Sequence, residues 1–220
     1  MYSSGEPVDG GIADSMYELG LKWEWGMDGR QRDFREAAMY FRGAAEWGCL
    51  DAQVKLGNVY FHGHGVQRNF KEATNLLRNA SDRGNVEACL SLGTWYYRGL
   101  VEVQHPSDAA AKNFLLAAKC GDLEGQVLFA SLCDEGRVGL PEAESKREAE
   151  KWFLQAAMQD DEWAKQWLSR YWWTQYGTTA PFDLVESEAA IIDKLKAAEQ
   201  GNINSKRWLS IFWEDDRAWA

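Results

Sequence analysis

Residues 52–84 read AQVKLGNVYFHGHGVQRNFKEATNLLRNASDRG, and this stretch decides the fold. Ala52, Leu56 and Tyr60 recur every four residues, which places them on one face of an α-helix. The paired glycines that follow end this helix, because glycine favours turns and adopts left-handed backbone conformations at little cost. The first half of the stretch therefore predicts one amphipathic helix and a turn.

The second half of the same stretch predicts another helix, over about residues 69–83, with alanines and leucines on its inner side. Gly84 has the position expected just past a helix C-terminus. A glycine inside a helix costs roughly 0.5–1 kcal/mol relative to alanine. Its reuse at Gly20, Gly57 and Gly93 therefore predicts that a partner helix approaches closely at these positions.

The pattern that predicts this helix pair recurs several times along the chain. Each copy closes on an Ala-Ala or Ala-Ser pair followed three residues later by a glycine or, once, by Asp160. The opening residues of successive copies are 37, 36, 37, 39 and 41 residues apart. A repeat at this period predicts a stack of helix pairs, in which a single pair buries too little surface to be stable alone. The opening residues are Leu19, Leu56, Leu92, Phe129, Leu168 and Leu209.

Charge and composition restrict the partners. The chain has 220 residues and a formal net charge of -10. Nucleic acid and anionic membranes are poor partners, because binding to either depends on Lys and Arg neutralising phosphates. A basic protein is the easier partner. The 12 tryptophans exceed the needs of such a core and favour a binding surface, although most of them are expected to fill helix interfaces.

The ends of the chain and its cysteines bear on domain organisation and location. Residues 1–12 are expected to form a flexible leader without a secretory signal, although a signal removed from the natural chain would leave the same start. Residues 13–220 are expected to form a single solenoid, closed by a helix over about residues 205–215.

The cysteines do not follow the repeat, which indicates reduced thiols in a cytoplasmic protein. They are Cys49, Cys89, Cys120 and Cys133.

The spacing Ala-x-x-x-Leu-Gly-x-x-Tyr-x-x-Gly-x-Gly-Val, followed by Ala-x-x-(Leu/Trp/Phe) and Ala-Ala-x-x-Gly, resembles the Sel1-like repeat family, whose members are related to tetratricopeptide repeats. The resemblance runs from about Ala13 to Trp213. It implies an all-α, right-handed α/α superhelix of about five helix pairs plus a C-terminal capping helix. It also implies a protein-binding molecule with no catalytic residues, cofactor or metal. The fourth copy departs from the pattern at Phe129-Ala130 and Cys133.

A partner surface is expected on the outward face of each first helix. Numbered from the opening Leu or Phe as zero, positions −5, −2, +2 and +5 lie opposite the inward residues. Apolar side chains and acids alternate there, which suits a basic, partly apolar partner. The alternative is a solvated acidic face with incidental apolar residues. The predicted contact residues are Tyr17, Asp51, Val54, Phe61, Glu87, Leu90, Tyr97, Glu124, Asp134, Trp163, Arg170 and Trp173.

Within this class, the resemblance favours a bacterial immunity protein that binds and neutralises a toxic effector. The alternative is an adaptor in a signalling or stress-response assembly, and an enzyme is a remote third class. His62 and His64 are ordinary loop residues of the motif, without a third ligand for a metal. The sequence contains no phosphate-binding glycine loop or nucleophile elbow.

Overall fold

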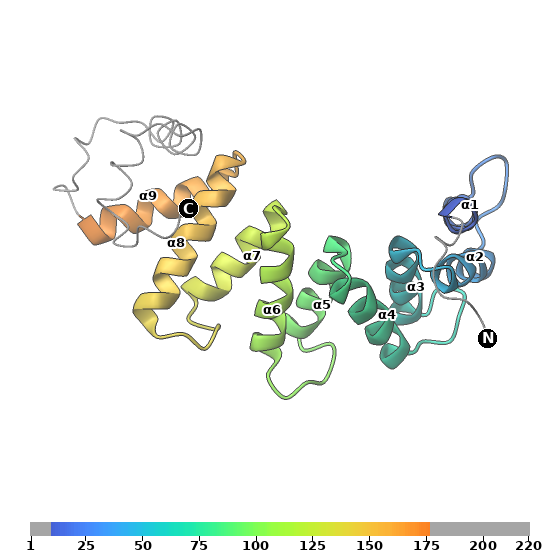
Figure 1. Ribbon diagram of the computed structural model, residues 1–220, viewed down its shortest axis with the longest axis horizontal. Coiled ribbons are helices and arrows are strands. Elements are labelled where there is room, and N and C mark those ends of the chain that lie inside the picture. The colour runs from blue at the N-terminus through green and yellow to red at the C-terminus, as the bar shows by residue number, and fades with distance from the viewer. Residues whose placement is uncertain (1–9, 177–220) are drawn as a thin grey trace, which may run out of the picture. The chain divides into compact units, whose positions relative to one another are not determined.

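A computed structural model describes residues 10–176, and the regular elements in that part of the chain are nine α-helices (Figure 1). This order confirms the expected all-α solenoid of helix pairs. The odd-numbered helices are called first helices below, and the even-numbered ones second helices. The helices are α1 (Gly10–Trp25), α2 (Phe34–Glu46), α3 (Leu50–His62), α4 (Phe70–Asp82), α5 (Val86–Tyr97), α6 (Pro106–Lys119), α7 (Leu123–Asp134), α8 (Glu142–Met158) and α9 (Glu162–Tyr176).

Two of the expected boundaries differ from the structure or lie beyond it. Helix α1 begins at Gly10, so the last residues of the expected leader are already helical. The second helix of the fifth pair, the loop before it and the capping helix over 205–215 lie outside the described residues. The single solenoid over 13–220 stays a prediction.

The chain divides into two compact units, Met1–Gly125 and Gln126–Ala220. In the first unit α1 packs on α2, α3 on α4 and α5 on α6, and the second helix of each of the first two pairs also packs on the next first helix (Figure 1). In the second unit α8 packs on α9. The first unit therefore contains the helix pairs that the repeat predicts, and the second unit contains the predicted packing of a second helix on the next first helix.

The longer spacing after the fourth opening residue predicts a loop over residues 137–145, but this prediction is too long, because α8 begins at Glu142. Acidic residues in the first turn of α8 suit the positive end of the helix dipole. Ser145 is buried, and its hydroxyl donates to the carbonyl oxygen of Cys133 at 2.7 Å. The extra residues of this repeat are thus absorbed partly by a helix of 17 residues, compared with 13 in α4.

The glycines inside the first helices make room for aromatic rings from the second helices. A Cβ atom added at Gly20 would lie 2.5 Å from Cε1 of Phe41, and one added at Gly93 would lie closer still to Cε1 of Phe114. Both phenylalanines are buried. The prediction of close helix approach at Gly20 and Gly93 is confirmed, and the ring fills the space that the missing side chain leaves.

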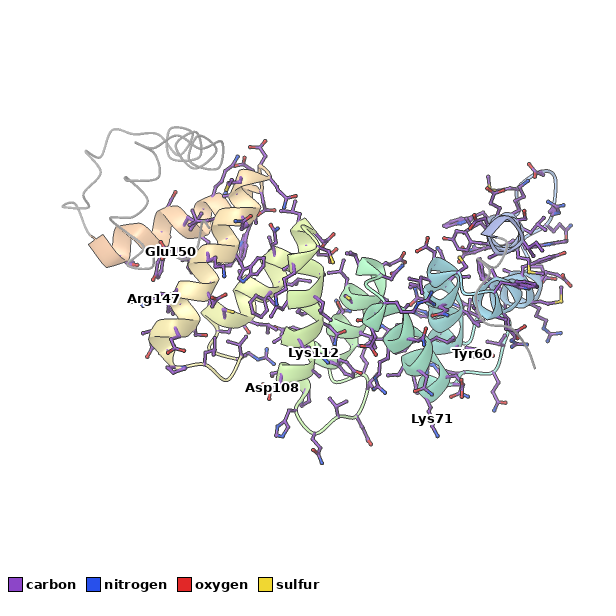
Figure 2. All side chains as sticks on the ribbon, in the orientation of Figure 1. Tyr60, Lys71, Asp108, Lys112, Arg147 and Glu150 are labelled. Atoms are coloured by element: carbon purple, nitrogen blue, oxygen red, sulfur yellow. The ribbon has the colours of Figure 1, made fainter. Side chains whose placement is uncertain are left out.

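A hydrogen bond from arginine to tyrosine joins successive repeats of the first unit. Arg42 of α2 donates to the Tyr60 hydroxyl of α3 at 2.8 Å, and Figure 2 marks Tyr60 on that helix. Arg78 of α4 donates in the same way to Tyr96 of α5 at 3.2 Å. The recurring large residue four positions after the opening Leu therefore links its helix to the preceding second helix. The equivalent residue of the fourth copy, Cys133, has no hydroxyl to accept such a bond.

Gly84, which follows the end of α4, has a φ of +86°, and a Cβ atom added there would meet nothing within 4 Å. Gly84→Ala should lower the free energy of unfolding by about 1 kcal/mol, because an L-residue in the left-handed region costs roughly 1–2 kcal/mol. Urea denaturation measures the change. Gly84→Asn is the matched control and should lose less, because asparagine tolerates this conformation. Equal losses in the two variants would show that backbone conformation is not the cause.

Candidate protein-binding surface

The structure separates the twelve predicted contact residues by exposure. Tyr17, Leu90 and Asp134 are half-buried, whereas Val54 and Phe61 are buried. Trp173 belongs to α9, but its side chain lies outside the described residues. The exposed members are Asp51, Glu87, Tyr97, Glu124, Trp163 and Arg170.

The prediction that Val54 and Phe61 face a partner is wrong. Val54 has no exposed surface, and Phe61 is 8% exposed. The Phe61 ring stacks on Trp95 of the next first helix, with 4.0 Å between ring centroids and 16° between ring planes. Phe61 also meets Phe70 edge to face at 5.2 Å. It therefore belongs to the packing between two repeats.

Asp134 is also occupied inside its own unit. Its Oδ1 accepts from Lys146 Nζ at 2.6 Å, and its Oδ2 accepts from Trp167 Nε1 at 3.0 Å. Both carboxylate oxygens are thus engaged by neighbouring helices. The role expected for Asp134 as a contact for a basic partner is not supported by this geometry.

Phe61 and Asp134 share position +5, near the C-terminal end of a first helix. At this position Glu24 lies 3.6 Å from Lys55 of the next first helix, and the Oε2 atom of Glu24 is buried. Phe61 and Asp134 likewise contact the first helix of the next repeat. A helical wheel of one helix shows position +5 as outward, but in these three repeats the side chain contacts the next repeat. Only Tyr97, among the described side chains at this position, is exposed.

Position −5 behaves differently and carries a row of carboxylates. These residues are exposed, and they stand one per repeat near the start of a first helix. Asp51 accepts from Asn85 Nδ2 at 2.8 Å, which fixes the orientation of its carboxylate. The same position holds Trp163 in the second unit, where it is 49% exposed. The carboxylate row consists of Asp14, Asp51, Glu87 and Glu124.

The pKa of the Tyr17 hydroxyl in α1 depends on two of these carboxylates. Its partial burial, and then the negative charges of Asp51 and Glu87, raise the pKa of Tyr17 to about 12. Carboxylates from the second and third repeats therefore act on a hydroxyl of the first repeat. Asp51 and Glu87 thus lie near enough to Tyr17 to disfavour the ionised form of its hydroxyl.

Apolar contact area accompanies the charge. Tyr97 in the first unit is 41% exposed, and Leu90 on the same helix is half-buried. In the second unit Trp163 meets Phe153 edge to face, with 5.0 Å between ring centroids, and keeps about half of its surface exposed. Exposed aromatic side chains on helices that also carry exposed acids suit a partner that is basic and partly apolar.

The described residues contain no group of three or more side chains suited to hold a metal ion. His62 and His64 instead stack on each other, with 5.2 Å between ring centroids. All four cysteines are free thiols, and burial raises the pKa of Cys133 to about 12 and also that of Cys89. A raised pKa disfavours the nucleophilic thiolate. Between residues 10 and 176, no helix is long and apolar enough to cross a membrane.

A motif that was not predicted from the sequence lies just before two of the second helices. Arg32-Asp33-Phe34 and Arg68-Asn69-Phe70 share the pattern Arg-Asx-Phe and lie 36 residues apart. In both copies the Asx side chain caps the following helix. The arginine Nε donates to a carbonyl oxygen of the preceding first helix. Its guanidinium lies over the phenylalanine ring. The recurrence at the repeat period is the signal that could have revealed this motif.

Helix pairs that recur in register define a helical-repeat protein. The chain belongs to the Sel1 repeat family, whose model matches residues 13–48, 50–85, 86–122 and 127–161. The matches confirm the family resemblance of the sequence. Sel1 repeats mediate protein–protein interactions, and proteins built from them are generally scaffolds. A search of curated proteins finds no match to the chain.

The solved structures that are similar to the chain include two helical-repeat proteins. One is c5321, a protective antigen present in uropathogenic Escherichia coli strains and displaying an SLR fold, with 28% identity and a TM-score of 0.69. That match covers 94% of this chain but only 42% of c5321. The other is a Sel1 repeat protein from Oxalobacter formigenes, with 23% identity, a TM-score of 0.65 and coverage of 93% and 78% of the two chains.

Proposed function

We propose that the protein is a non-catalytic interaction solenoid that holds a basic segment of another protein against its first helices. The carboxylate row carries the proposal, because an exposed acid recurs at position −5 in each of four repeats. The influence of Asp51 and Glu87 on Tyr17 indicates that these charges act on one surface. Tyr97 and Leu90 supply the apolar contact that charge alone lacks.

The more specific proposal is that the protein is a bacterial immunity protein, as the family resemblance of the sequence favours. Such a protein would cover a basic surface of a toxic effector. Its support is the acidic surface and the net charge of -10, which would steer a basic partner into contact. Free cysteines are compatible with the cytoplasmic location that is part of this form. The alternative is an adaptor that joins several proteins.

Charge reversal tests the carboxylate row. Glu87→Lys combined with Glu124→Lys should weaken the binding of a fluorescein-labelled peptide of lysine and leucine by about tenfold or more, since each tenfold corresponds to about 1.4 kcal/mol. Fluorescence anisotropy at two salt concentrations measures the affinity of each variant for the peptide. Glu72→Lys combined with Asp108→Lys is the matched control, because these acids also occupy first turns but on second helices. Equal weakening in both pairs would leave only net charge as the cause.

The same variants distinguish the two forms of the proposal. A dedicated inhibitor should form a salt-sensitive one-to-one complex with the product of a neighbouring gene and protect cells that express that product. The reversed pair should lose this protection. An adaptor should instead recover several partners at weaker affinity from the cells in which the chain occurs, and no single neighbouring product should dominate.

A further inference from the structure

We propose that the loops of the first two repeats form a second docking surface, which binds an acidic segment of a partner protein. This surface differs in charge and position from the carboxylate row, so it goes beyond the function proposed above. It lies where first helices lead into second helices. The surface, called the loop-edge patch, consists of Arg32, Phe34, His62, His64, Arg68 and Phe70.

The two loops meet and form one continuous surface. The Phe34 ring lies 5.1 Å from the His64 ring, and the His64 ring stacks on His62 at 5.2 Å with 16° between planes. A Cβ atom added at Gly65 would lie 2.6 Å from the backbone nitrogen of Arg35. The second loop therefore rests directly on the start of α2. The buried Phe61 ring contacts both His62 and Phe70, so rings from both repeats form a series between the two arginines.

The guanidinium groups are held in place before any partner arrives. Arg32 Nε donates to the Glu24 carbonyl oxygen at 2.8 Å, and Arg68 Nε donates to the Phe61 carbonyl oxygen at 2.9 Å. The guanidinium carbon of Arg32 lies 4.4 Å from the centre of the Phe34 ring, and the equivalent distance from Arg68 to its ring is 4.8 Å. Groups fixed in this way lose less side-chain entropy when they bind.

These cations have no ion-pair partner in the part of the chain that the structure describes. No described carboxylate lies within 4.0 Å of the charged nitrogens of Arg32, Arg68 or Lys71. Lys22, by contrast, pairs with Asp28 at 2.8 Å. A guanidinium presents a fork of donors that matches a carboxylate. The loop-edge patch therefore has the charge and the donors to receive Asp and Glu side chains.

The extent of the patch favours a short peptide rather than nucleic acid. Figure 2 shows Lys71 on α4 and Asp108 on α6 along the lower edge of the first unit, and Glu102 precedes α6. Acids stand in the first turns of α2, α4 and α6 alike, so a longer polyanion that ran along these loops would meet the carboxylates of Glu36, Glu72 and Asp108. The net charge of -10 also opposes a nucleic acid at longer range. Phe70 is 43% exposed and can contact apolar residues of the segment.

The test uses the full chain and a short fluorescein-labelled peptide of glutamate and phenylalanine, followed by fluorescence anisotropy. Arg32→Glu combined with Arg68→Glu should weaken peptide binding by about tenfold or more. These substitutions also remove loop hydrogen bonds. Arg35 and Lys71 directly follow Phe34 and Phe70 of the patch, at the starts of α2 and α4. Arg35→Glu combined with Lys71→Glu is therefore the second patch variant, because neither side chain has a hydrogen bond or ion pair with a described residue. It should weaken binding in the same direction.

The matched control is Arg83→Glu combined with Lys119→Glu, which changes the net charge equally at the other ends of the second helices. This control should bind the acidic peptide within about twofold of the unaltered chain, and all three variants should keep their binding of the lysine–leucine peptide. Equal weakening in control and patch variants would overturn the proposal. So would a labelled single-stranded oligonucleotide that binds more tightly than the peptide and shows the same dependence on the patch arginines.

Discussion

Gly93→Val should lower the free energy of unfolding by about 3 kcal/mol, the upper part of the range for overpacking a core. The added Cβ would overlap three atoms of the Phe114 ring, which is 2% exposed and has no free space to enter. Valine is β-branched and gains little helix propensity to offset the clash. Urea denaturation followed by circular dichroism measures the loss.

Gly11→Val is the control, since a Cβ atom added at this helical glycine meets nothing within 4 Å. It should leave stability within about 0.5 kcal/mol, as surface substitutions usually do. Phe114→Ala alone should cost about 3–5 kcal/mol, yet combined with Gly93→Val it should cost less than the sum, because valine fills part of the vacated space. Strict additivity would show that Gly93 and the ring do not share this space.

The fold was largely predictable because the same residue types recur at the same positions of each repeat. Glycine at positions such as Gly57 and Gly93 indicated close helix contact, and the structure places a leucine or phenylalanine side chain there. Asn69 was expected at the start of a second helix and is its N-cap, with a hydrogen bond from Glu72 N. The start of α8 at Glu142 was not predictable from the period. It depends on the burial of Ser145 against the neighbouring first helix, which is a tertiary contact.

The candidate surface was less predictable, because it depends on how one repeat covers another. The acids at Asp51 and Glu87 are exposed as expected. Phe61 and Asp134 lie on the same predicted stripe, but both contact the first helix of the next repeat, which buries Phe61 and engages the Asp134 carboxylate. The position of a residue on one helix defines its direction, whereas its exposure also requires the separation and rotation of neighbouring repeats. A sequence repeat alone does not contain those two quantities.

The loop-edge patch changes how the two forms of the proposed function are weighed. An inhibitor that covers one basic effector needs the carboxylate row alone. An adaptor that joins two proteins benefits from surfaces of opposite charge on different edges of the same helix pairs. Arg32 and Arg68 therefore favour the adaptor if they bind the acidic peptide while Glu87 and Glu124 bind the basic one. Binding of both peptides at once, measured with two fluorescent labels, would establish this arrangement.

Phe61→Ala should lower the free energy of unfolding by about 3–5 kcal/mol, the range for truncating a buried phenylalanine. The variant removes the ring that stacks on Trp95 at 4.0 Å and leaves a cavity between two repeats. Urea denaturation measures the loss, and the lysine–leucine peptide measures binding under native conditions. If the Phe61 ring serves packing, its removal should cause a large loss of stability.

Tyr97→Ala is the comparison, because Tyr97 occupies the same repeat position but is 41% exposed. Its removal should cost about 1 kcal/mol or less in stability and weaken the peptide complex by about tenfold, as expected of an aromatic contact at an interface. The two substitutions should thus separate packing from recognition at one repeat position. The interpretation fails if Phe61→Ala keeps full stability and loses the peptide, since that pattern belongs to an exposed anchor.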